Sequence, residues 1–177
     1  DMSYSDYATP NRIIAYASYK ADWSKFLSTT FTLVYLGYEQ ARFSYVYSND
    51  FNQDGLSNDL IYIPNSASEI TFVTNGIFSA QQQSDAFMSY INQDKYLSKR
   101  KGQFAVRNGA KMPWFSNLDF RLLQDILPIS KHKNYGLQLS MEIENFTNLL
   151  NNDWGVTKRT NYNNGAILSV ASAPTAT

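Results

Sequence analysis

The sequence contains no cysteine and one histidine, and it has no excess of charge of either sign. Without cysteine the chain can form neither a disulfide framework nor a thiolate metal site, and it has no cysteine nucleophile. Fifteen basic residues balance fifteen acidic ones, so no net field attracts nucleic acid, and we expect no nucleic-acid partner. No window approaches the roughly 18 consecutive apolar residues of a membrane-spanning helix. If the chain meets a membrane, we expect it to do so as strands.

Aromatic residues, by contrast, are abundant. The chain has 13 Tyr, 11 Phe and 3 Trp among its 177 residues, although its mean hydropathy is below zero. Each buried phenol needs a hydrogen-bond partner, whereas a surface that passes from apolar to aqueous surroundings accommodates many of them. The composition therefore favours a protein with such a surface, in a chain long enough for a core of its own.

Apolar and polar residues alternate with a period of two in four stretches, which predicts strands at about 11–20, 26–47, 114–126 and 135–146. The fourth is the most regular, with Leu137, Leu139, Met141 and Ile143 on one face and Gln138, Ser140, Glu142 and Glu144 on the other. The second is far longer than the usual strand of about 5–6 residues. Crossing the apolar band of a membrane takes roughly 9–11 tilted residues, which fits these lengths.

The connections between these stretches alternate in length. Residues 22–25 and 128–134 are short turns, while 48–113 is a long loop, and an outer loop begins at about 147. Short turns alternating with long loops are typical of an outer-membrane β-barrel. Within the long loop, apolar spacing after Ser79 predicts a short helix. We therefore expect an all-β fold, with 1–177 a single segment of an antiparallel transmembrane barrel.

Three quoted stretches carry a family resemblance: "RFSYVYSNDFNQDGLSNDLIYIP", "YLSKRKGQFAVRNGAKMPWFSNLDFRLLQD" and "LQLSMEIENFTNLLNNDWG". In this order they resemble the carboxy-terminal barrel region of TonB-dependent outer-membrane receptors, in particular the Oar-like subfamily, over most of residues 12–155. The resemblance implies about four strands near the C-terminal end of a plugged barrel of about 22 strands. No plug or TonB box precedes Asp1, and the aromatic-ended final strand is not found, so we expect the chain to be a fragment.

The resemblance also implies a function and partners. The receptor would lie in the bacterial outer membrane with 48–113 outside the cell, and would import an unidentified substrate with energy supplied through TonB. Its partners would be the remaining barrel strands, the plug, the TonB complex, lipid and lipopolysaccharide, and a surface lipoprotein. The alternative from the residues is a soluble β-sandwich that binds a partner through the 48–113 loop.

The stretch "SNDFNQDGLSNDL" resembles the beginning of a calcium-binding loop. The candidate ligands are Asp50, Asn52 and Asp54 through side chains, Leu56 through its carbonyl, and Asn58 or Asp59 as the closing ligand. Hard oxygen ligands at alternate positions followed by a glycine suit Ca²⁺. No Glu closes the loop at the twelfth position, however, so the same residues also predict an Asx-rich turn.

The remaining candidates are the charged residues of the polar rows, Asp119, Arg121, Glu142 and Glu144, which we expect to face the barrel lumen. Such a row can guide a substrate, or it can serve only as a charge lattice between neighbouring strands. Acidic residues two apart occur on any polar strand face, and no nucleophile motif accompanies them. We therefore expect no enzymatic activity.

Overall fold

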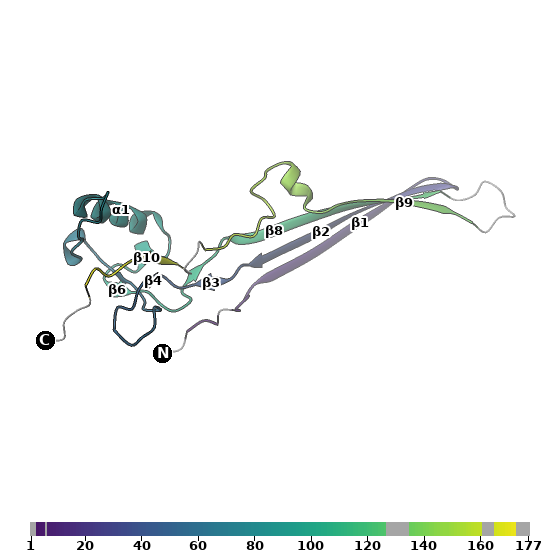
Figure 1. Ribbon diagram of the computed structural model, residues 1–177. Helices are drawn as coiled ribbons and strands as arrows, with labels where there is room; N and C mark the ends of the chain where they lie inside the picture. The colour runs from purple at the N-terminus through teal and green to yellow at the C-terminus, as the bar shows by residue number, and fades with distance from the viewer. Residues whose placement is uncertain (1–2, 6, 127–134, 161–164, 173–177) are drawn as a thin grey trace. The chain divides into compact units, whose positions relative to one another are not determined.

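Four long strands form one antiparallel sheet, in the order β1 (Arg12–Ser24), β2 (Leu27–Glu39), β8 (Trp114–Ile126) and β9 (Leu137–Ile143). The computed structural model describes residues 3–5, 7–126, 135–160 and 165–172, and Figure 1 shows the four strands side by side. The prediction of a mainly β fold with an antiparallel sheet and one helix is confirmed. The described strands form an open sheet, with β1 and β9 at its edges. The predicted turn at 128–134 lies outside the described residues.

The chain folds as two compact units. Unit 2 comprises Thr9–Gln40 and Pro113–Lys158 and contains the four-stranded sheet. Unit 1 comprises Asp1–Ala8, Ala41–Met112 and Arg159–Thr177. Unit 1 is compact because the long connection between β2 and β8 buries a hydrophobic core of its own.

The second strand ends earlier than its alternation predicts. β2 stops at Glu39, and the buried Gln40 follows, with its side-chain amide donating to the Pro113 carbonyl at 2.7 Å and accepting from the Lys158 N–H at 3.0 Å. These bonds take the place of a further ladder pair. Residues 42–47, predicted as a continuation of the strand, belong instead to unit 1.

The last long strand is also shorter than its prediction of 135–146. β9 ends at Ile143, and Asn145 adopts a left-handed φ of 51° that is incompatible with a strand. The Asn145 N–H donates to Asp119 Oδ1 at 2.8 Å, which fixes the exit of the chain. A 3₁₀ turn, η3 (Phe146–Leu149), follows at the start of the predicted outer loop.

The described residues of unit 1 contain three pairs of short strands and one helix. The pairs are β3 (Arg42–Phe43) with β7 (Ala110–Lys111), β5 (Tyr62–Ile63) with β6 (Gln103–Phe104), and β4 (Val46–Tyr47) with the parallel β10 (Ala166–Leu168). Two 3₁₀ turns, η1 (Ala67–Glu69) and η2 (Leu97–Lys99), complete the unit. The core contains Tyr45, Tyr47, Ile61, Ile63, Phe87, Ile91, Leu97, Ala105 and Ala110. Because β4 and β5 contribute side chains to this core, the predicted external loop is a folded body.

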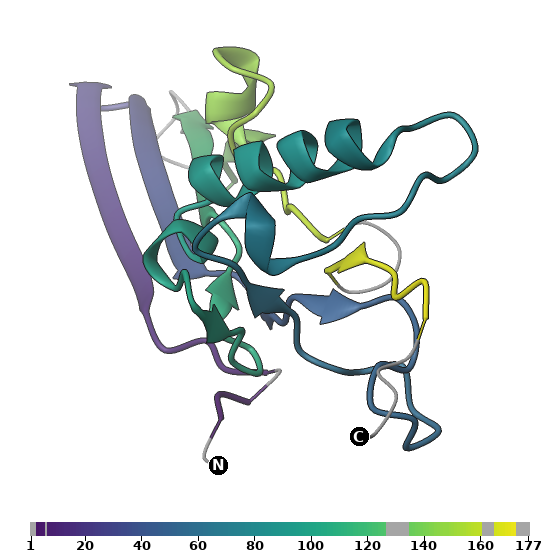
Figure 2. The same cartoon turned by 90° about the vertical axis from the view of Figure 1, so that its left-hand side faces the viewer.

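The helix α1 (Ala80–Gln93) begins where its cap predicts. Ser79 Oγ accepts the Gln82 N–H at 3.2 Å, and Gln82 Oε1 accepts the Ser79 N–H at 2.9 Å, which forms a capping box. Phe87 and Ile91, one turn apart, are buried against the short strands, over which the helix lies in Figure 2. No helix in the described part of the chain is long and apolar enough to cross a membrane.

Candidate functional site

The register of the sheet places most of its polar residues on one side, here called the polar face. Cross-strand partners share a face, and the partners Ser18 and Thr32, Thr32 and Arg121, and Arg121 and Glu142 connect all four strands. The polar face holds Ser18, Thr30, Thr32, Asn117, Asp119, Arg121, Asp125, Gln138, Ser140 and Glu142, together with the apolar Ile14, Tyr16, Val34, Leu36 and Leu123. Its centre is therefore a mixed surface with both charges.

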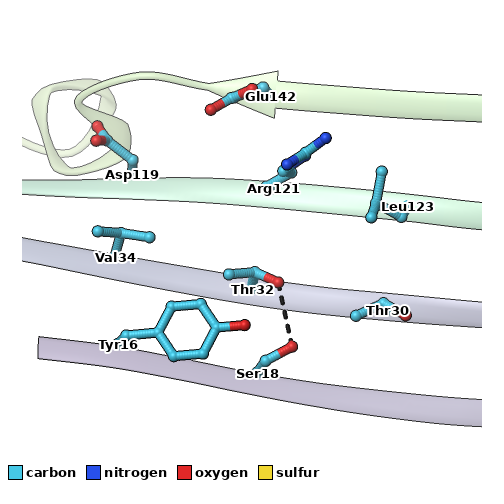
Figure 3. Close-up of a pocket in the computed structure, with 9 residues that line it drawn as sticks. All are labelled: Tyr16, Ser18, Thr30, Thr32, Val34, Asp119, Arg121, Leu123 and Glu142. Atoms are coloured by element: carbon cyan, nitrogen blue, oxygen red, sulfur yellow. Dashed lines mark hydrogen bonds between the residues drawn. The ribbon is translucent and has the colours of Figure 1, made fainter.

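A shallow hollow of about 300 Å³ lies on the polar face. Figure 3 shows the residues that line it, which are Tyr16, Ser18, Thr30, Thr32, Val34, Asp119, Arg121, Leu123 and Glu142. The Ser18 and Thr32 hydroxyls lie 3.2 Å apart and bridge β1 to β2. The hydroxyls, one guanidinium and two carboxylates can hold water or a polar solute by hydrogen bonds.

Three of the four predicted charged residues meet at this hollow. Arg121 and Glu142 are cross-strand partners, and Asp119 precedes Arg121 on the same face of β8. Asp119 Oδ1 accepts the Asn117 side-chain amide at 2.9 Å, so part of its hydrogen-bonding capacity is used within the strand. The fourth, Glu144, follows the end of β9 and does not line the hollow.

The opposite side, here called the apolar face, is exposed or half-buried along its length. It holds Ile13, Ala15, Ala17, Tyr19, Leu27, Phe31, Leu33, Tyr35, Leu118, Phe120, Leu122, Ile126, Leu137, Leu139, Met141 and Ile143. Leu33, at the middle of β2, is 40% exposed, and Leu139 of β9 is 53% exposed. The described part of unit 2 contains no second sheet that could cover these side chains. A contiguous apolar surface of this extent marks a site that contacts another apolar surface.

A hydrogen-bonded belt crosses the apolar face near the turn between β1 and β2; we call it the turn-end belt, formed by Trp23, Thr29 and Gln124. Trp23 Nε1 donates to Thr29 Oγ1 at 2.7 Å, and Thr29 Oγ1 donates to Gln124 Oε1 at 2.6 Å. Gln124 Nε2 donates to the Ser28 carbonyl at 2.9 Å. The polar atoms of this belt thus satisfy one another across three strands, although they lie among apolar side chains.

A second aromatic belt, the far belt, crosses the other end of the same face and contains Tyr35 and Trp114. Trp114 Nε1 donates to the Tyr35 hydroxyl at 3.4 Å. The Tyr35 hydroxyl and Trp114 Nε1 meet over Gly37. Thr29 and Gly37 therefore mark the positions of the two belts along β2, and at about 3.3 Å per residue they lie roughly 26 Å apart along the strand. Only apolar face residues such as Phe31, Leu33 and Phe120 lie between the belts. Neither belt was predicted, although Thr29 and Gln124 interrupt the apolar rows of the sequence.

No family model matches this chain, and no curated protein and no solved structure matches it either. The two faces of the sheet and the organisation of unit 1 are therefore the structural basis from which a function is inferred.

The candidate calcium ligands lie in a loop whose side chains bind local backbone. Asp50 Oδ1 accepts the N–H groups of Gln53 at 2.6 Å and Asp54 at 3.2 Å, and its Oδ2 accepts the Gly55 N–H at 2.7 Å. Asn52 Oδ1 accepts the Asp54 N–H at 3.0 Å. These are the hydrogen bonds of Asx turns, and they hold Gln53 at a positive φ of 62°.

Asp54 and Asp59 bind backbone N–H groups in the same way. Asp54 Oδ1 accepts the Leu56 N–H at 2.9 Å, and Asp59 Oδ2 accepts the Phe51 N–H at 2.7 Å. The carbonyl of Asn58 accepts from the Arg107 guanidinium at 3.0 Å, which places a positive charge at the end of the loop. The described residues contain no group of three or more acidic or histidine side chains that could hold a metal ion.

Unit 1 also contains a buried tyrosine cluster that the sequence did not predict. Tyr45 is 2% exposed, and its hydroxyl donates to Asp94 Oδ2 at 2.9 Å and lies 3.3 Å from the Tyr90 hydroxyl. Burial raises the pKa of Tyr45 far above its ordinary value, and the bonds with Tyr90 and Asp94 raise the pKa further. The phenol therefore stays neutral and joins the end of α1 to the segment before β4, which is a structural role.

Proposed function

We propose that this chain is a segment of a TonB-dependent receptor of the bacterial outer membrane, which binds and imports a substrate. The observation that carries the proposal is the exposed apolar face bounded by the turn-end belt and the far belt. A transmembrane barrel presents an apolar band about 25 Å tall between aromatic girdles. The belts lie roughly 26 Å apart along β2, and a strand tilt of about 35–45° would make their separation across the membrane roughly 20 Å, somewhat less than this height.

Backbone hydrogen bonding supports the same proposal. In lipid every backbone polar group must be paired, so an open sheet needs further strands at both edges. β1 and β9 are the edges of the described sheet, and they would pair with the remaining strands of the barrel. The polar face would then line the lumen, where Arg121, Asp119 and Glu142 would meet water, the plug or the substrate.

The organisation of unit 1 supports an external position for the long connection. β2 and β8 are joined through unit 1, whereas β1 and β2 are joined by a two-residue turn. In outer-membrane barrels the short turns face the periplasm and the long connections face outward. Unit 1 would thus meet the substrate, lipopolysaccharide or a surface lipoprotein, and the plug and the TonB complex would supply the coupling.

The membrane part of the proposal is tested with a matched pair of variants in the intact gene product, Leu33→Arg and Thr32→Arg. Adjacent in β2, the two residues lie on opposite faces. A charge facing the middle of the bilayer costs about 2–4 kcal/mol, and a charge facing the lumen far less. We expect Leu33→Arg to reduce the amount of folded protein in the outer membrane and Thr32→Arg to leave it near the wild-type level. Equal amounts for both variants would overturn the lipid assignment.

The transport part is tested by recovering the intact gene product from fractionated cells and measuring its mass. The proposal requires an outer-membrane protein several times longer than this chain, with a plug and a segment that cross-links to TonB. Recovery of a soluble protein of this size would instead favour the β-sandwich binding module.

A further inference from the structure

The sequence contains the pair Asn–Gly at 75–76, 108–109 and 164–165. The third pair lies partly outside the described residues. The first two have the same local chemistry but very different surroundings, so the structure separates them. Both belong to unit 1, and the inference below does not depend on the proposed function.

An asparagine followed by glycine is open to a reaction that needs only water. The deprotonated backbone nitrogen of the glycine attacks the side-chain amide carbon, and a C–N bond forms while the bond to the amide nitrogen breaks and ammonia leaves. Water then opens the cyclic imide at either carbonyl, which gives aspartate or isoaspartate. Glycine favours the attack because it has no Cβ to hinder the approach. The net change is hydrolysis of one amide, with no oxidation or reduction.

Asn75 is the more open of the two sites. Asn75 is the first residue of a tight hairpin turn. Its N–H donates to the Phe78 carbonyl and the Phe78 N–H donates to the Asn75 carbonyl, both at 3.0 Å. Neither bond involves the attacking nitrogen of Gly76. Within the described residues, neither the Gly76 N–H nor the Asn75 side chain has a hydrogen-bond partner. Asn75 is exposed, and a Cβ added to Gly76 would meet no atom within 4 Å.

Asn108 lacks this freedom. It is 7% exposed, its Nδ2 donates to the Tyr4 carbonyl at 2.7 Å, and its Oδ1 accepts from Ser44 Oγ at 3.2 Å. The attacking group is also occupied, because the Gly109 N–H donates to the Val106 carbonyl at 3.0 Å. Reaction at this position must therefore wait for a packed segment to open.

We propose that Asn75 is a site of spontaneous deamidation and that the fold protects Asn108 from the same reaction. The product places a negative charge at the tip of the hairpin, beside Ile77, which is 90% exposed, and the exposed Phe78. The surface that unit 1 presents there changes with the age of the molecule, from neutral and apolar to anionic.

The test is peptide mapping of the folded full chain by mass spectrometry during incubation at neutral and mildly alkaline pH. Replacement of the amide NH₂ by a carboxylate oxygen is measured at both positions, and isoaspartate is identified enzymatically. We expect deamidation at Asn75 to be about tenfold faster or more than at Asn108, because Asn108 reacts only after local opening. The rate at Asn75 should rise with pH, because the attacking nitrogen must lose its proton.

Three controls show whether the fold causes the difference. In the denatured chain the two rates should converge. Ser44→Ala, which removes a hydrogen-bond partner of Asn108, should accelerate deamidation at Asn108 and leave Asn75 unchanged. Asn75→Gln should abolish the modification at 75 alone, because its longer side chain closes a less favourable ring. Equal rates in the folded chain, or a difference that persists after denaturation, would overturn the proposal.

Discussion

The ring of Tyr35 lies over Gly37, two residues further along the same face of β2. A Cβ added at Gly37 would come within 2.5 Å of the Tyr35 hydroxyl oxygen and 2.9 Å of Trp114 Nε1. The glycine therefore leaves the space in which the two aromatic side chains of the far belt meet. Aromatic side chains laid over a glycine protect a strand where it has no side chain of its own.

Replacing Gly37 with alanine should displace these side chains. The clash involves the outer ends of Tyr35 and Trp114, so we expect them to move apart and the weak bond between them to break. Alanine stabilises a strand by about 0.5–1 kcal/mol relative to glycine. This gain offsets much of the stability that is lost when the two aromatic side chains separate. The unfolding free energy should thus change little while the fluorescence of Trp114 changes. Tyr35→Phe is the control, since it removes the bond without moving the ring, and unchanged fluorescence in Gly37→Ala would contradict the prediction.

The turn-end belt makes a stronger prediction for Thr29. Thr29→Val keeps the shape of the side chain but leaves Trp23 Nε1 and Gln124 Oε1 without their shared partner. Both groups would then be unsatisfied among apolar side chains and detergent. A polar group left unsatisfied away from water costs about 1–3 kcal/mol, and we expect a loss of unfolding free energy in this range, measured in detergent. Thr29→Ser should restore most of it. Thr30→Val, on the other face, is the matched control, and an equal loss there would show that the belt is not responsible.

The long strands could be predicted from the sequence because the alternation of apolar and polar residues is a local signal. β8 begins and ends at the predicted residues, and Ser79 correctly predicted the start of α1. The end of β2 could not be predicted, because the pattern of alternating aromatic residues continues through Tyr45 and Tyr47. Their side chains enter the core of unit 1, which forms only when residues 61–110 fold back upon them. A periodic pattern reports two faces, and it does not identify what covers each face.

The candidate site shows the same limit. The faces of Asp119, Arg121 and Glu142 follow from parity, but their meeting at one hollow depends on the register between β2, β8 and β9. Thr29 and Gln124 look like defects of the apolar rows until the register places them opposite one another. In the Asp50 loop, composition could not distinguish ligands for an ion from acceptors for backbone amides.

Tyr45 predicts a dependence of stability on alkaline pH. The folded state raises its pKa above the ordinary value of 10.0, chiefly through burial, so its contribution is complete below pH 10 and is lost as the pH rises further. Tyr45→Phe should lower the unfolding free energy at neutral pH by about 1.5–3 kcal/mol, because a hydrogen bond to a charged carboxylate is lost. Above pH 10 the difference from wild type should narrow. Denaturant unfolding at a series of pH values, followed by the helical circular dichroism of α1, measures this, and a constant difference would contradict the prediction.

The last prediction concerns Asp50 and the nature of its loop. Its carboxylate accepts three backbone N–H groups, from Gln53, Asp54 and Gly55, so Asp50→Ala should release the turn and speed hydrogen exchange at Gln53 and Gly55. The local loss of stability should be about 1 kcal/mol or more, because a hydrogen bond contributes about 0.5–1.5 kcal/mol net.

Calcium should have no effect on this loop, because both carboxylate oxygens of Asp50 already have donors. We expect calcium at roughly millimolar concentration, the range of weak extracellular sites, to leave hydrogen exchange in the wild-type loop unchanged. A chelator should leave it unchanged as well. Asp54→Ala is the matched comparison, because Asp54 accepts the Leu56 N–H and the Asn52 side-chain amide and should loosen only the second half of the turn. The opposite result would be that calcium slows hydrogen exchange in the wild-type loop in a saturable way and has no such effect in either variant. It would show that these carboxylates bind the ion, and that their hydrogen bonds to backbone N–H groups form only in its absence.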